Sequence, residues 1–345
     1  MKNHLVFSKS QKFLRKSWRQ VIPPALLIFC TLIACCIGQY PISLHDLWQT
    51  LFSSPSSADS IIHTVLWQVR IPRILTAILA GAALSMAGAT YQSMFKNPLV
   101  SPDILGVSAG AGLGAVAIIF VGGSLWQLQL SAFIGGLLAV AIVYAIAKIA
   151  RYHAPILALV LAGIALAALL KAGISILKIF ADPYSQLTTM TFWLLGALNM
   201  ATFHDLAFMI PLILLAMLPL ILLRWRMNLL SLEDEEAQSL GLNLSQTRLI
   251  FIVSATLMTS TIVAVTGIIG WIGLIVPHVA RLWLGEKGSD FRQLLPVTIF
   301  FGSAILLIAD TFSRAAFSVE IPLGIITAIV GVPFFLGLLI LGGRK

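Results

Sequence analysis

The chain has 345 residues, of which 59% are hydrophobic and only 10% are charged. A soluble globular domain carries about 25% charged residues, so this composition excludes an ordinary soluble protein and predicts one that uses lipid as part of its solvent. The net charge of +9 does not indicate nucleic-acid binding, because the basic residues cluster at the N-terminus and in short gaps between apolar runs, as topology signals do.

Residues 1–20 are predicted to be a basic cytoplasmic segment ahead of a first apolar run at 21–40. A basic region followed by an apolar stretch also resembles a signal peptide, and Leu32–Cys35 resembles a lipoprotein cleavage site. Because many more apolar runs follow, we interpret 21–40 as an uncleaved first helix. The cysteines of this run are odd in number and lie inside a predicted helix, so we expect neither a disulfide nor a metal site at Cys30, Cys35 and Cys36.

Ten apolar runs are long enough, or nearly so, to cross a hydrocarbon core of about 30 Å, which takes about 20 helical residues. The eighth is short and contains Pro277, which predicts a kinked or partial span. No gap between the runs could hold a soluble domain, so we predict an all-α polytopic membrane protein with one transmembrane domain at 21–342 and about ten transmembrane helices. The runs are 21–40, 66–92, 103–122, 126–149, 155–180, 205–223, 247–268, 271–284, 293–314 and 322–342.

The basic residues are divided unequally between alternate gaps, which predicts how the chain crosses the membrane. With the N-terminus in the cytoplasm, the cytoplasmic side holds 17 of the 22 basic residues and the outer side holds three, with Lys171 and Lys178 in or near the outer end of the fifth run. Ten crossings then place both termini in the cytoplasm. The 17 are Lys2, Lys9, Lys12, Arg15, Lys16, Arg19, Lys96, Lys148, Arg151, Arg224, Arg226, Arg248, Arg281, Lys287, Arg292, Arg344 and Lys345, and the outer three are Arg70, Arg73 and Arg314.

The largest predicted cytoplasmic gap, residues 224–246, is called the acidic loop below. It holds the acidic cluster Glu233, Asp234, Glu235 and Glu236, flanked by apolar residues that include Leu229, Leu230 and Leu240. This pattern is typical of short amphipathic helices that lie along the membrane surface. The loop is either a solvated acidic turn or a docking surface for a cytoplasmic partner.

Three arginines on the outer side run against the excess of positive charge on the cytoplasmic side. Arg70 and Arg73 flank Ile71 and Pro72 at the start of the second run, and Arg314 ends the ninth. Snorkelling at helix ends is one interpretation. Binding to acidic groups of a soluble partner is the other, because a guanidinium group can hold a carboxylate through two hydrogen bonds.

Few charges lie at membrane depth. Asp310, late in the ninth run, is a functional candidate by its position, but a buried hydrogen-bonding role with Arg314, one turn further on, is an equal alternative. An ion-driven carrier usually needs several acidic residues within the membrane. The scarcity of such residues here weakens the interpretation of this chain as an ion-driven carrier. Glycines at 106, 110, 112 and 114, and at 267, 270 and 273, predict closely packed helices.

No catalytic motif is recognised in the sequence. It has no Walker A sequence, no His-Glu-x-x-His pattern and no nucleophile elbow, and its histidines are scattered. We therefore expect a transport protein that is not an enzyme and that binds no cofactor or metal of its own. If ATP drives it, a separate chain must bind the ATP and Mg²⁺.

Long motifs in this chain resemble the iron-chelate and vitamin B12 permease family of ABC importers, the FecCD type, which has the type II importer fold. The resemblance extends over about residues 20–342. The matching stretches are Arg70–Arg73, Ala80–Leu84 with Gly88, Lys96–Ser108 with Gly114, Trp193–Gly196, Glu236–Gly241, Gly270–Arg281, Leu294–Pro296, Ala309–Asp310, Pro322–Gly324 with Thr327, and Gly331–Phe335.

The resemblance implies partners and roles for the residues singled out above. It implies two permease subunits, as a homodimer or with a paralogue, in the bacterial inner membrane. Two cytoplasmic ATPase subunits would lie below them, and a periplasmic or lipid-anchored binding protein would deliver substrate from above. Arg70, Arg73 and Arg314 would receive acidic residues of the binding protein. The residues implied to couple to the ATPase lie in two short helices and are Leu229, Leu230, Glu233, Asp234, Glu235, Glu236, Leu240 and Gly241.

The resemblance also implies that the fifth and tenth helices line the pathway and that the turn before the fifth helps to close it. Here that turn is apolar and includes Pro155, Ile156 and Leu157, and an apolar constriction can gate by excluding water. The expected cargo is an iron chelate, either a siderophore or haem, with cobalamin or a metal oxyanion as alternatives. An ion-coupled secondary transporter and a membrane protein without transport activity are the alternative functions.

Overall fold

The computed structural model describes residues 2–52, 60–150, 155–316 and 318–342, which form helices and connecting turns without a strand. The main helices are α1 (Lys2–Cys36), α4 (Ile71–Met94), α5 (Val107–Phe120), α6 (Leu125–Ile149), α7 (Pro155–Phe180), α9 (Phe203–Leu222), α12 (Leu244–Thr266), α13 (Ile272–Leu284), α14 (Phe291–Ala315) and α15 (Leu323–Gly342). Shorter elements are α2 (Leu44–Phe52), α3 (Ser60–Thr64), η1 (Val65–Arg70), η2 (Pro102–Leu105), α8 (Gln186–Leu194), α10 (Arg224–Leu230), α11 (Asp234–Ser239) and η3 (Gly285–Ser289).

Each of the ten predicted runs coincides with a main helix, which confirms the all-α class. Among the described residues, seven helices are long and apolar enough to cross a membrane, namely Trp18–Cys36, Ile61–Met94, Leu125–Ile149, Pro155–Phe180, Phe203–Leu222, Leu244–Thr266 and Phe291–Ala315. The other three runs form α5 with 14 residues, α13 with 13, and α15 with 20. The sequence predicted that the eighth run would be short, and it forms α13. Its apolar stretch is little more than half as long as a full membrane crossing requires.

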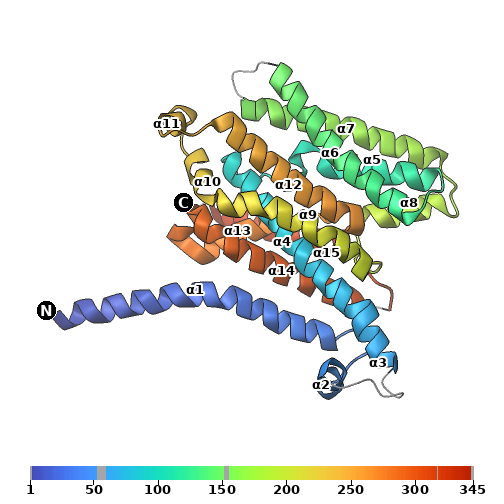
Figure 1. The fold of residues 1–345 in the computed structure, drawn as a ribbon, viewed down its shortest axis with the longest axis horizontal. Coiled ribbons are helices and arrows are strands. Elements are labelled where there is room, and N and C mark those ends of the chain that lie inside the picture. The colour runs from blue at the N-terminus through green and yellow to red at the C-terminus, as the bar shows by residue number, and fades with distance from the viewer. Residues whose placement is uncertain (1, 53–59, 151–154, 317, 343–345) are drawn as a thin grey trace.

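Helices α4 and α12 form the centre of the bundle, as Figure 1 shows. Helices α9, α13 and α14 pack around α4, and α1 runs along the edge of α14. On the other side of α12, α5, α6 and α7 form a second group that continues into α8. The two groups are therefore joined mainly through α12.

Small residues let α4 lie almost in backbone contact with its neighbours. A Cβ atom on Gly81 would lie 2.2 Å from the carbonyl oxygen of Gly302 in α14, and one on Gly88 would lie 1.8 Å from that of Gly273 in α13. The predicted close packing of α5 is also present, because a Cβ on Gly110 would lie 2.3 Å from the Gly135 oxygen of α6. Gly270, in contrast, has nothing within 4 Å of such a Cβ.

Replacing Gly88 by Ala is expected to destabilise the bundle by about 3 kcal/mol or more, because the added methyl group meets backbone that no side-chain rotation can move. The measurement is thermal unfolding of the purified subunit in detergent. Gly337→Ala in α15 is the matched control, because a Cβ there meets nothing within 4 Å. Equal melting temperatures for the two variants would contradict the close α4–α13 contact.

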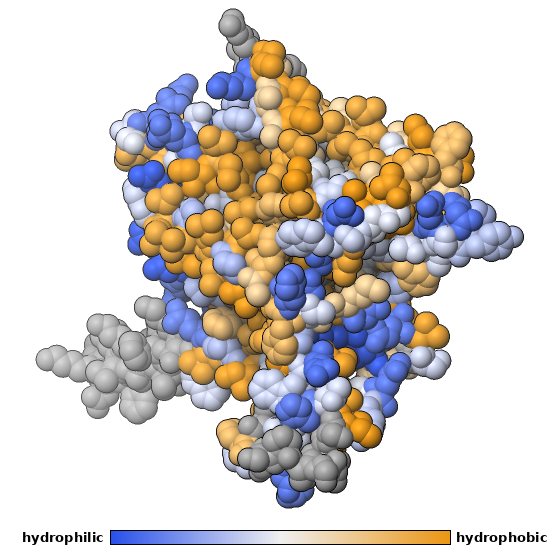
Figure 2. Space-filling view, turned by 45° about the vertical axis from the view of Figure 1, so that its right-hand side comes forward, coloured by the Kyte–Doolittle hydropathy of each residue, from blue (hydrophilic) through white to orange (hydrophobic). Residues whose placement is uncertain are grey.

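The bundle has two polar ends. The arginine face is the end that holds Arg70, Arg73 and Arg314, and the acidic face is the opposite end, which holds α10 and α11 (Figure 1). Figure 2 shows hydrophobic side chains over most of the displayed surface, with hydrophilic ones gathered toward its lower part. A broad apolar surface of this kind is expected where a protein contacts lipid.

Candidate functional site

Arg70 and Arg73 are neighbours in the sequence and Arg314 is distant from both, yet the three come together at the arginine face. Arg70 ends the π-helix η1, Arg73 lies in the first turn of α4, and Arg314 lies in the last turn of α14. Their exposed fractions are only 3%, 6% and 5%. They therefore lie beneath the surface of this chain, so neither snorkelling nor free exposure describes their side chains.

Arg73 is held by two carboxylates of the chain itself. Its Nε donates to Asp310 Oδ1 at 2.8 Å, and its Nη1 lies 2.9 and 3.0 Å from the two oxygens of Glu320. Asp310 is fully buried, and Arg314 Nε lies 3.7 Å from its Oδ2, an ion pair too long for a hydrogen bond. The predicted buried hydrogen-bonding role of Asp310 is confirmed, but its hydrogen-bond donor is Arg73, and Arg314 is paired with it only as a longer ion pair.

Arg70 and Arg314 also fix the end of the first membrane helix. Arg70 donates to the carbonyl oxygens of Cys35 and Tyr40, and Arg314 donates to that of Ala34. These carbonyls lie at or just beyond the end of α1, where cationic side chains satisfy free acceptors and interact favourably with the helix dipole. The arginine cluster, defined as Arg70, Arg73, Arg314, Asp310 and Glu320, thus ties α1, α4 and α14 together.

A cavity of about 490 Å³ opens beside this cluster. Arg73 and Glu320 line one side of it, and residues of α8 and the end of α12 at Thr266 line the others. Glu320 has 34% of its side chain exposed, against 7% for Arg73 and Arg314 and 0% for Asp310. Glu320 is therefore the accessible carboxylate of the cluster.

Glu320 was missed in the sequence. The available signal was an acidic residue two positions before Pro322, in the short gap between the ninth and tenth runs. Its pairing with Arg73 joins residues 247 positions apart, so it depends on how α4, α14 and α15 pack.

At the acidic face, the acidic loop forms the two short helices that its amphipathic pattern predicted, α10 and α11. Leu230 and Ala237 are buried and Leu229 packs partly against the core. The Asn228 amide bonds Asp290 Oδ1 at 2.7 Å, which anchors α10 to the start of α14. Partial burial acts to raise the pKa of Asp290, but hydrogen bonds from Asn228 and the Arg292 N–H outweigh it and leave the pKa below its usual value.

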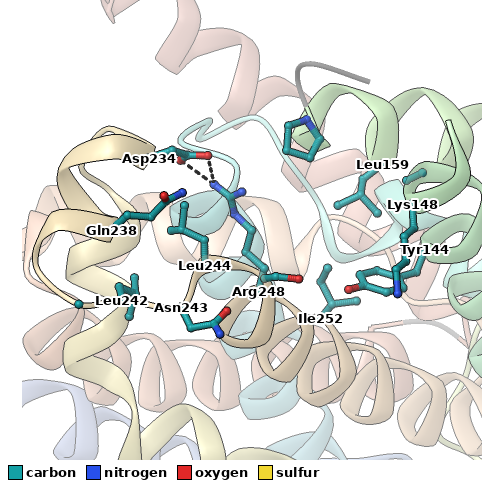
Figure 3. Close-up of a pocket in the computed structure, with 14 residues that line it drawn as sticks. Tyr144, Lys148, Leu159, Asp234, Gln238, Leu242, Asn243, Leu244, Arg248 and Ile252 are labelled. Carbon is teal, nitrogen blue, oxygen red and sulfur yellow. Dashed lines mark hydrogen bonds and ion pairs between the residues drawn. The ribbon is translucent and has the colours of Figure 1, made fainter. Parts of the chain in front are cut away.

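The four acidic residues of the loop divide into two kinds. Asp234 points back to the bundle, where both its oxygens accept from Arg248 Nη2 at 2.7 and 2.9 Å, and Lys96 Nζ lies 3.9 Å away (Figure 3). The remaining residues of the predicted set are exposed to solvent, namely Glu233, Glu235, Glu236, Leu240 and Gly241. Asp234 therefore attaches α11 to α12, and the three exposed glutamates form an outward acidic surface.

A second cavity, of about 740 Å³, lies between the acidic loop and the adjacent ends of α6 and α7 (Figure 3). Pro155 of the predicted gate lines this cavity, Ile156 packs against the core, and Leu157 is 44% exposed. Ala154 of the same turn lies outside the described residues. Within this one chain the three gate residues point to different surroundings and do not form a single constriction.

The helical bundle, its apolar surface and its two opposite polar ends define a polytopic membrane protein. Comparison with known proteins places it more narrowly. The chain belongs to the FecCD transport family, whose model matches residues 26–341, and it is thus a permease subunit of an ABC importer and not an enzyme.

Two relatives and one solved structure illustrate the similarity. The Fe(3+)-citrate import system permease protein YfmE of Bacillus subtilis is 38% identical, with 94% of this chain and 95% of the relative covered. The molybdate import system permease protein MolB of Haemophilus influenzae is 35% identical, with 90% and 91% covered. A structure described as an inward-facing conformation of a metal-chelate type ABC transporter is 35% identical, with a TM-score of 0.83 over 93% of this chain and 98% of that one.

Proposed function

We propose that this chain carries an iron chelate, a ferric siderophore or haem, across the bacterial inner membrane. A binding protein would deliver the chelate at the arginine face, and ATPase subunits would dock at the acidic face. The observation that carries the proposal is the placement of the arginine cluster and the outward acidic surface at opposite ends of one bundle. A permease that receives a carrier on one side and a motor on the other needs two such surfaces.

The arginine face is the proposed docking surface for the periplasmic or lipid-anchored binding protein. Among the residues that the structure describes, the three guanidinium groups of Arg70, Arg73 and Arg314 meet two carboxylates, those of Asp310 and Glu320, so the cluster favours an acidic partner. Guanidinium groups bind carboxylates with well-defined geometry. The excess of basic residues at the other end of the bundle supports an orientation with both termini in the cytoplasm.

The acidic face is the proposed docking surface for the cytoplasmic ATPase subunits. Glu233, Glu235 and Glu236 project from α11 without taking part in its attachment to the bundle. ATP and Mg²⁺ would be bound by those subunits, with none bound by this chain. Closure of the ATPase pair would move α10 and α11 and alternate the access of the pathway.

Helices α7 and α15 are proposed to line the pathway against a second permease copy, identical or paralogous. Only 17% of an apolar 18-residue stretch of α7 is buried within this chain, whereas 83% of the corresponding stretch in Ile61–Met94 is buried. Leu161, Ile164 and Leu169 of α7 and Ile329 and Val330 of α15 are among the exposed apolar residues. Such surfaces need another helix or lipid to cover them, and lipid would cover what the second copy leaves.

The cargo proposal is supported by the similarity to the ferric citrate permease and to the metal-chelate type transporter. The molybdate relative makes an oxyanion the main alternative cargo.

The experiment uses proteoliposomes that hold the permease with its ATPase subunits. They receive ⁵⁵Fe-labelled ferric citrate, a ferric siderophore, ⁵⁵Fe-haem or ⁹⁹Mo-molybdate together with the cognate binding protein. We expect ATP-dependent ⁵⁵Fe uptake that persists when ionophores collapse ion gradients. Uptake of molybdate alone would contradict the cargo, and uptake that follows an ion gradient without ATPase subunits would contradict the transport mechanism.

A further inference from the structure

The segment between α14 and α15 carries Glu320 across the arginine face. Its backbone is fixed just after that residue: Ser313 Oγ donates to the Ile321 oxygen at 2.6 Å, and Leu323 N–H donates to the Gly196 oxygen at 2.9 Å. Gly324 N–H adds a hydrogen bond of 3.0 Å to the Leu195 oxygen. The position of Glu320 is thus linked to the first turn of α15 and to the end of α8.

Arg73 is shared between two carboxylates of different accessibility. Asp310 is fully buried and takes the Nε side, whereas Glu320 takes Nη1 and has 34% of its side chain exposed, at the wall of the 490 Å³ cavity. An entering carboxylate can therefore reach Arg73 from the cavity, where it meets the negative charge of Glu320. Two carboxylates at the same Nη1 group repel each other, so one must give way.

We propose that Glu320 is an internal competitor that occupies Arg73 while no binding protein is docked and exchanges with a carboxylate of the binding protein when docking occurs. This inference rests on the proposed docking function of the arginine face. Exchange is favoured over simple addition because Asp310 and Glu320 already surround this one guanidinium group, and a third carboxylate would be repelled by both. The cavity provides space for the entering side chain.

The exchange gives docking a local structural consequence. Once Glu320 leaves Arg73, the segment from Ser318 to Pro322 loses its ion-pair attachment to α4, while the hydrogen bonds that Leu323 and Gly324 of α15 donate to Gly196 and Leu195 remain. Binding-protein docking would then loosen the start of α15 relative to α4, and α15 is one of the two helices proposed to line the pathway.

The test measures the affinity of the binding protein for the complete transporter in nanodiscs. Removing the competitor with Glu320→Gln is expected to tighten binding by about fivefold, the value of one partly exposed ion pair. Glu320→Ala is a second variant with the same expected direction. Asp182→Asn makes the same change in net charge at an exposed position near α8, and it should leave the affinity close to that of the wild type.

A purely structural role of Glu320 in orienting Arg73 predicts weaker binding, so unchanged or weaker binding by both Glu320 variants would overturn the exchange. Docking itself is followed separately by maleimide labelling of Ser318→Cys, an exposed position on this segment, with Cys30, Cys35 and Cys36 replaced by Ala. Protection of Ser318→Cys by the binding protein keeps the docking proposal even when the exchange fails. Full labelling in the presence of saturating binding protein overturns the docking proposal and the exchange together.

Discussion

Replacing Asp310 by Ala is expected to lower the free energy of unfolding by about 3–5 kcal/mol, because the buried Arg314 then lacks a carboxylate and the buried Arg73 keeps only Glu320. Both guanidinium groups have 7% of their side chains exposed and Asp310 has none, so water cannot compensate for the loss. The measurement is denaturant or thermal unfolding of the purified subunit in detergent.

The double variant Arg73→Met with Asp310→Leu is expected to recover part of that loss, since it removes the buried Arg73–Asp310 pair and fills its space with apolar atoms while Arg314 still lacks Asp310. Glu320→Gln serves as the control, because its pair is one-third exposed and should change the stability by about 1 kcal/mol or less. A loss below about 1 kcal/mol for Asp310→Ala would show that the buried pair does not hold α4 to α14.

The same geometry affects how docking can be tested by mutation. Reversing Arg73 to Glu would place a third carboxylate against Asp310 and Glu320, so the loss of uptake would combine misfolding with failed docking. Variants of Glu320 avoid this ambiguity because they leave the buried Arg73–Asp310 pair intact.

Changing Glu233, Glu235 and Glu236 together to Lys is expected to reduce ATP-driven uptake at least about tenfold, because reversed charges at a complementary interface cost several kcal/mol. The three side chains are exposed, and α11 is held to the bundle through Asp234 and Arg248, so the permease should still fold. The measurements are copurification of the ATPase subunits and ATPase activity stimulated by the binding protein.

Glu286→Lys, an exposed acid outside the acidic loop, is the matched control and should leave uptake unchanged. Normal copurification and normal stimulation in the triple variant would refute the assignment of α11 as the ATPase docking surface. A general effect of surface charge would instead impair the control and the triple variant alike.

The sequence predicted the helices well because hydropathy and length determine where a chain can cross lipid. The ten apolar runs became helices, and the amphipathic pattern around Glu233–Glu236 became α10 and α11. Local periodicity is sufficient for such elements, since each depends mainly on residues within a few turns of itself.

The side-chain partners could not be predicted in the same way. Arg73 meets Asp310 across 237 positions, and Asp234 turns inward because Arg248 of α12 lies beneath it. In the sequence Asp234 was indistinguishable from the three glutamates beside it. The arginines at the outer ends of α4 and α14 were predicted to lie on one side, but their burial follows from how α1 ends against them.

Helix α12 gives the two ends of the molecule a common mechanical element. Its 23 residues extend about 35 Å. Arg248, near its first turn, binds Asp234 of the acidic loop, and Thr266, its last residue, borders the cavity beside Arg73 and Glu320. An unbroken helix of this length transmits axial displacement with little internal deformation. Any axial displacement of α12 caused by movement of α11 would thus reach the cavity beside Arg73 and Glu320 at the other end of the bundle.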